Sequence, residues 1–137
     1  MGEYTRRRNV NRGFMKLVVW NEAIELFRWI YGLLDDIGLT DFKLRSQIVN
    51  AAQSISSNIA EGYCRKSVKE YLQFLNIALG SSGELITRIV ALKSLGVVSE
   101  KSFEEFDIRH YSVENKLIAL KKSLQEKEKN GTWIEIL

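Results

Sequence analysis

Hydrophobic residues recur at every third or fourth position through four long stretches of the chain, and glycines separate these stretches. This spacing places apolar side chains on one face of a helix. The sequence contains no proline, the residue that most strongly breaks helices. The pattern therefore predicts an all-α protein with helices at about 14–37, 41–62, 67–95 and 99–128.

The connections between these helices are short, which favours neighbours that run in opposite directions. We expect one domain, an antiparallel up-down-up-down four-helix bundle over residues 14–128. A basic, flexible N-terminal arm, 1–13, should precede it, and a C-terminal tail, 129–137, should follow. The end of that tail, Trp133–Leu137, could form a short strand or an arm that docks on a neighbour.

The first predicted helix is apolar over more of its surface than a single core requires. Its two apolar stripes together cover roughly 200° of the helix, whereas one core needs only about 100°. The excess faces a second copy of the chain, or the helix is simply buried deeply within one bundle. Trp29, on the polar side of this helix, could stack on a base or on a protein partner.

Two features within the later helices indicate their packing. Gly80 and Gly83 flank two serines in the third helix, and small residues let another backbone approach closely, so we predict a tight packing point there. His110 falls on the apolar stripe of the fourth helix, where a hydrogen-bonded core histidine is expected.

The stretch "SISSNIAEGYCRKS", residues 54–67, places two polar residues where an apolar stripe should continue, and Gly62 follows them. We expect Asn58 and Glu61 to hydrogen-bond the chain as it turns through Gly62, since buried polar groups usually serve the fold. A ligand site is the alternative.

The same turn predicts a charged contact. If the second and third helices pair about residues 64 and 65, the numbers of facing residues add up to about 129, which places Arg45 opposite Glu84. Gln47 could add a hydrogen bond. Because a buried charge needs a partner, we predict a buried Arg45–Glu84 pair.

The formal net charge is only +3, but the predicted topology gathers the cations at one end. This end has twelve Lys and Arg, Lys127 and Lys129 included, against six Glu, which gives a balance of +6. The opposite end has four Lys and Arg against seven Asp and Glu, which gives −3. Such a surface attracts phosphate backbones with little sequence preference. Alternatively, the charges only solvate the helix ends. The candidate nucleic-acid contacts are Arg6, Arg7, Arg8, Arg12, Lys16, Arg65, Lys66, Lys69, Lys121 and Lys122.

Candidate catalytic chemistry is sparse. The single cysteine, Cys64, lies beside Arg65 without an evident base, and the single histidine leaves no pair for a metal. No GxSxG or Gly-rich phosphate loop occurs. We therefore expect no catalytic residue, no metal site, no cofactor and no enzyme activity. No apolar run reaches the length of a signal peptide core or a membrane span, so a cytoplasmic protein without a membrane partner is expected.

Residues 44–89, "LRSQIVNAAQSISSNIAEGYCRKSVKEYLQFLNIALGSSGELITRI", resemble the four-helix-bundle family of 23S rRNA intervening-sequence proteins. The most specific features are the run Asn58–Gly62 together with Gly80-Ser81-x-x-Glu84, and the resemblance extends over roughly 14–125. It implies a bundle that assembles as a cyclic homopentamer. Members are encoded in insertions within rRNA genes, and relatives include the accessory protein of diversity-generating retroelements, which binds nucleic acid and a reverse transcriptase.

Two classes of function remain. The first is a non-catalytic, nucleic-acid-binding oligomer that uses its basic end on RNA, DNA or a ribonucleoprotein, and that could act beside a nucleic-acid-processing protein. The second is a protein-binding scaffold without direct nucleic-acid contact. Salt-dependent binding to RNA separates the two.

Overall fold

The computed structural model describes residues 10–131, and this part of the chain contains helices and no strand, which confirms the all-α prediction. Arg6, Arg7, Arg8 and Trp133–Leu137 lie outside the described residues. A short 3-10 helix precedes four long α-helices. The elements are η1 (Val10–Lys16), α2 (Val18–Asp36), α3 (Phe42–Tyr63), α4 (Val68–Ser94) and α5 (Glu100–Lys129).

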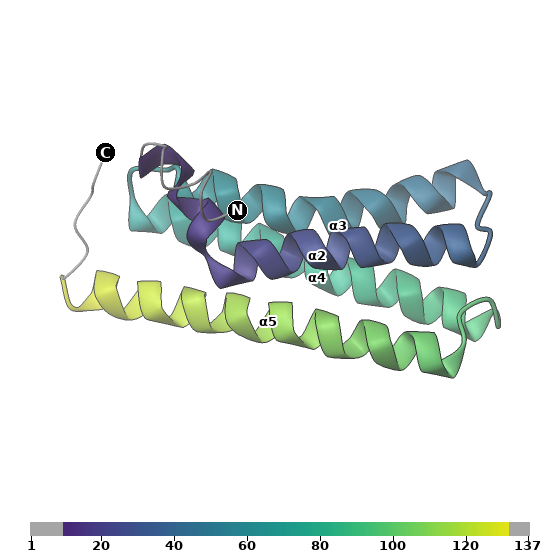
Figure 1. Ribbon diagram of the computed structural model, residues 1–137. Helices are drawn as coiled ribbons and strands as arrows, with labels where there is room; N and C mark the ends of the chain where they lie inside the picture. Colours follow the sequence, from purple (N-terminus) through teal and green to yellow (C-terminus); the bar gives the residue numbers. More distant parts are fainter. Residues whose placement is uncertain (1–9, 132–137) are drawn as a thin grey trace.

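The four long helices lie side by side (Figure 1). α2 packs against α3 and α5, and α4 packs against the same two helices, so α2 and α4 lie diagonally across the core. In Figure 1 the start of α2, the α3–α4 turn and the end of α5 share one end of the molecule. Three segments far apart in sequence therefore meet at that end.

The helix boundaries follow local signals in the sequence. Asp41, Ser67 and Ser99 cap α3, α4 and α5, and each side-chain oxygen accepts a hydrogen bond from a backbone N–H at 3.0–3.1 Å. Gly38 and Gly96 follow α2 and α4 with positive φ angles of 66° and 80°, a conformation that costs glycine little. These caps and glycines explain why four helices could be recognised from the sequence.

The start of the first helix differs from the prediction. Residues 14–16 lie in η1, and Leu17 is extended, with a ψ angle of 129°. The Asn21 side chain stabilises the break, because its Nδ2 donates to the carbonyls of Met15 and Leu17, each at 2.9 Å. η1 then packs against α3, where the Phe14 ring meets the Tyr63 ring edge-on.

His110 is a buried, hydrogen-bonded core residue, as predicted. Its side chain is 1% exposed, and Nε2 lies 2.8 Å from the carbonyl oxygen and 2.9 Å from the hydroxyl oxygen of Ser82. Because a carbonyl can only accept, we assign the proton to Nε2. The contact ties α5 to α4 in the middle of the core.

Among the described residues, α4 is the one helix long and apolar enough to cross a membrane by length and composition. A buried core helix passes the same test, and α4 contributes Leu75, Leu85 and Ile89 to the core, all fully buried.

Candidate nucleic-acid interface

The register between α3 and α4 differs from the predicted one and explains the wrong pairing. Gln47 accepts a hydrogen bond from Arg88 at 3.0 Å, and Ser54 accepts one from Ser81 at 2.8 Å. The numbers 47 and 88, like 54 and 81, add up to 135 rather than 129. The sum is six larger although α3 ends at Tyr63, only one residue past the predicted boundary, so the error lies in the assumed pairing and not in the helix ends.

The predicted Arg45–Glu84 pair is therefore wrong. Arg45 bonds to Asp35 at 2.6 Å and lies over the Tyr31 ring, at the end of α2. Glu84 bonds to Arg88 one turn further along α4, at 3.0 Å. The side chains of Asp35 and Glu84 are 62% and 48% exposed, so both are surface pairs rather than a buried one.

Asn58 and Glu61 contact different groups from those expected. Asn58 Nδ2 donates to the carbonyl and hydroxyl oxygens of Ser54 at 2.7 and 2.9 Å, and Ser54 in turn accepts from Ser81 on α4. Glu61 is exposed and accepts from Arg65 at 3.1 Å. Asn58 thus belongs to a polar contact between α3 and α4, and Glu61 holds a cation at the α3–α4 turn.

The glycines in these helices have other roles than predicted. A Cβ on Gly62 would lie 2.9 Å from Phe74 Cβ and from a ring carbon of Tyr71, so glycine is needed because α4 approaches closely. Gly80 and Gly83 face open space, and a Cβ added at either position would have no neighbouring atom within 4 Å. The predicted tight packing at these two glycines is therefore wrong, and the serines between them make the helix contacts instead.

Trp29 is not free for stacking on a base. Its ring packs against Phe106 of α5, with ring centroids 6.2 Å apart, and the Arg109 guanidinium lies 5.7 Å from its centroid. The predicted polar position was misleading because α5 covers this side of α2.

A polar cluster that the sequence did not reveal joins α2 to α5. Glu22 accepts a hydrogen bond from Ser112 at 2.6 Å and pairs with Lys116 at 3.0 Å. Burial pushes the pKa of Glu22 upward, but these two hydrogen bonds and the Lys116 charge outweigh it, so the pKa lies below its ordinary value. Ninety residues separate Glu22 from Ser112, so no local spacing signals the cluster.

We expect this cluster to make stability depend on acidity. A carboxyl with a lowered folded-state pKa stabilises the fold above its unfolded pKa of about 4.5, and that contribution is lost as the pH falls through the folded value. Glu22→Gln should therefore lower the free energy of unfolding by about 1 kcal/mol at pH 7 and by much less at pH 3. Urea unfolding at both pH values measures this. Glu25→Gln, which loses only an exposed bond to Arg28, is the control; equal losses for Glu22→Gln at both pH values would contradict the assignment.

At the basic end, the Arg65 side chain is held by three contacts. It pairs with Glu61 at 3.1 Å and with Glu70 at 3.9 Å, and its guanidinium lies 4.8 Å from the centroid of the Phe74 ring. Its charge is therefore largely compensated. Arg65 mainly fixes the α3–α4 turn, although it belongs to the predicted contact set.

The lysines around Arg65 are different. None of Lys16, Lys66, Lys69, Lys121 and Lys122 forms an ion pair within the described part of the chain, and Lys121 alone of them is half-buried. They come from η1, the α3–α4 turn, the first turn of α4 and the last third of α5, which meet at one end in Figure 1. The structure thus brings these predicted residues to the same end of the molecule.

The charges of the described residues are unequal between the two ends. Nine Lys and Arg, with Arg12, Lys127 and Lys129 included, stand against four Glu at the basic end, a balance of +5. The opposite end has Lys43, Arg45, Lys93 and Lys101 against seven Asp and Glu, or −3, and two of its cations are paired, with Asp35 and Glu100. No group of three or more potential metal-ligating side chains occurs among the described residues.

These features define a four-helix protein with one basic end. The family model of the 23S rRNA-intervening sequence proteins matches residues 15–119, most of the chain, so the chain belongs to this family. The family resemblance seen in the sequence is thereby confirmed.

A solved structure supports the fold. The chain is similar to a protein of unknown function from the S23 ribosomal protein family of Bacteroides thetaiotaomicron, with a TM-score of 0.70 and 24% identity. The similarity covers 77% of this chain and 99% of that one. None of the curated proteins compared matches the chain.

Proposed function

We propose that this protein is a non-catalytic, nucleic-acid-binding homo-oligomer that contacts the phosphates of RNA or DNA through its basic end. The observation that carries the proposal is a set of five lysines, four of them exposed, that form no ion pair within residues 10–131 and come from three segments that meet at one end. Lysines in this state attract phosphates by displacing counterions, and no carboxylate of the described residues pairs with them. Membership of a family named for an intervening sequence of 23S rRNA favours RNA as the nucleic acid.

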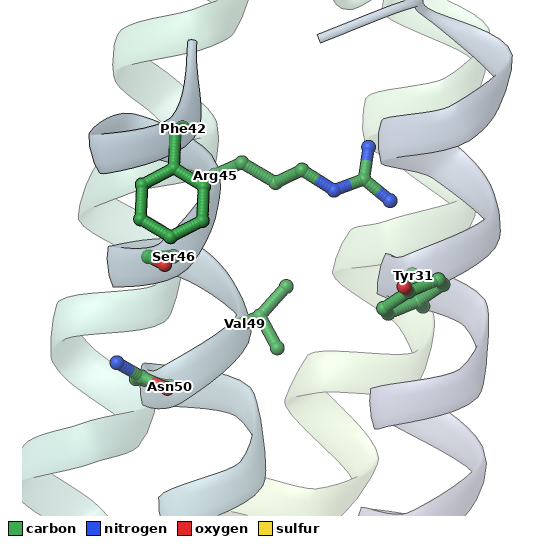
Figure 2. Close-up of a pocket in the computed structure, with 6 residues that line it drawn as sticks. All are labelled: Tyr31, Phe42, Arg45, Ser46, Val49 and Asn50. Carbon is green, nitrogen blue, oxygen red and sulfur yellow. The ribbon is translucent and has the colours of Figure 1, made fainter. Parts of the chain in front are cut away.

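The proposed assembly is a ring of up-down-up-down bundles, five according to the family resemblance. A hollow between α2 and α3, with Arg45, Ser46 and Asn50 beside its apolar residues, offers a surface for such a contact (Figure 2). Phe42 is 84% exposed at its rim, and Tyr31, 45% exposed, faces it from α2. Parallel protomers in a ring would place their basic ends on one face and so multiply the charge that each presents.

A binding titration tests the proposal. The full-length protein should bind unrelated RNA and DNA duplexes at about 50 mM salt, and log K should fall linearly with log salt by about 0.7–0.9 per phosphate contact. Filter binding or fluorescence anisotropy measures both quantities. Absence of binding at micromolar protein would contradict the proposal and favour a scaffold whose basic end meets an acidic protein.

A further inference from the structure

The outer side of α5 carries a second heptad stripe that the fold does not use. Six positions spaced by alternating fours and threes, roughly 150° around the helix from the core stripe, form one straight row. All six are exposed: Glu104, Ile108, Tyr111, Asn115, Ile118 and Lys122. Ile108 is 73% exposed and Ile118 is 48% exposed, so the fold leaves two aliphatic side chains of this row uncovered.

The stripe is complementary to itself when it is reversed. In an antiparallel pair of helices, the numbers of facing residues add up to a constant. At a sum of 226, Glu104 faces Lys122 of the other copy, Ile108 faces Ile118, and Tyr111 faces Asn115. One arrangement therefore gives two ion pairs, two aliphatic contacts and two polar contacts.

The groups at the two ends of the stripe are available for this contact. Neither Glu104 nor Lys122 forms an ion pair within the described part of the chain, although charged residues are abundant on α5. A polar residue at a central seam position, such as Asn115, is known to fix the register of helix pairs. A seam with only two aliphatic positions buries little apolar area and should hold copies together weakly.

We infer that two copies of this chain associate through α5, antiparallel and about a two-fold axis near residue 113. The same patch serves both partners, as a two-fold contact requires. The contact goes beyond the proposed ring, because it uses α5 rather than the hollow between α2 and α3. It directs the two basic ends away from each other. Lys122 takes part in the contact, whereas Lys16, Lys66 and Lys69 of each copy stay open to nucleic acid.

Site-specific crosslinking tests the register. In full-length protein carrying Cys64→Ser, which removes the single cysteine, Ile108→Cys and Ile118→Cys are made as separate proteins. A mixture of the two should form a disulfide-linked dimer under oxidising conditions. In this dimer the unchanged Ile118 of one copy still faces the unchanged Ile108 of the other. Each protein alone should not crosslink, because two copies of residue 108 would lie roughly 15 Å apart along the seam, beyond disulfide reach. Crosslinking of either protein alone, or none in the mixture, would overturn the inference.

A charge swap tests the same contact without cysteines. Glu104→Lys or Lys122→Glu alone should weaken self-association by about tenfold in sedimentation equilibrium, because each places like charges opposite one another twice. The double variant should restore it. Glu105→Lys, an exposed change outside the stripe, is the control. Unchanged association in the single variants, or no recovery in the double variant, would refute the pairing. Circular dichroism checks that each variant is folded. Neither the crosslinking nor the charge swap depends on nucleic-acid binding.

Discussion

Replacing Gly62 with alanine should lower the free energy of unfolding by about 1–3 kcal/mol, the cost of adding a methyl group to a closely packed contact. The new Cβ would lie 2.9 Å from Phe74 Cβ and 3.2 Å from the Tyr71 backbone oxygen. A Cβ and a backbone atom of α4 cannot swing aside as the end of a flexible side chain could, so α3 and α4 would have to separate. The better helix propensity of alanine, about 1 kcal/mol, offsets only part of this cost.

The chain provides matched controls for this substitution. Gly80→Ala and Gly83→Ala add the same methyl group to a helix interior where nothing lies within 4 Å. Each should raise the free energy of unfolding by up to about 1 kcal/mol, because only the gain in helix propensity applies. Thermal and urea unfolding of the three variants measures the difference. If Gly62→Ala were as stable as Gly80→Ala, the close approach of α4 to Gly62 would be wrong.

The sequence predicted the helices well because their signals are local. The side chains of Asp41, Ser67 and Ser99 each cap the start of a helix by accepting from the backbone N–H three residues later. Gly38 and Gly96 follow the ends of α2 and α4, so each boundary depends on a few consecutive residues. The core stripe of α5, with His110, follows from the same periodicity.

The contacts between helices were harder to predict, because they depend on a register that no local signal defines. Gly62 was interpreted as the end of a helix, although it lies inside α3 and permits close packing. The pairing assumed about residues 64 and 65 placed the sum of facing residue numbers at 129 rather than 135, and this produced the wrong partner for Arg45. Glycine can end a helix or permit close packing inside one, and only the position of the neighbouring helix shows which of the two applies.

The candidate interface was partly predictable for a related reason. Charge at the ends of helices depends on which segments share an end, and not on the register along the helices. The predicted lysines therefore lie at one end in spite of the register error. What the sequence could not reveal is that Arg65 is held by Glu61, Glu70 and Phe74, because this requires the geometry of the turn.

Reversing two lysines at the basic end should weaken nucleic-acid binding at least tenfold at about 50 mM salt. The variant Lys66→Glu/Lys69→Glu removes two cations that form no ion pair with another described residue, one in the α3–α4 turn and one in the first turn of α4. If both contact phosphates, the slope of log K against log salt should become shallower by about 1.4–1.8. The fold should be unaffected, since a glutamate at residue 69 suits the N-terminal end of a helix. Arg65 is left unchanged because its loss would also disturb the turn.

The opposite end supplies a control with the same change in net charge. Lys43→Glu/Lys101→Glu also replaces two exposed lysines, in the first turns of α3 and α5, that form no ion pair in the part of the chain that the structure describes. If binding uses the basic end, this variant should keep the original slope and lose little affinity. Equal losses in the two variants would mean that nucleic acid responds only to the total charge of the protein. An unchanged affinity in Lys66→Glu/Lys69→Glu would contradict an interface at the basic end, because two exposed cations of the α3–α4 turn region would then contribute nothing to binding.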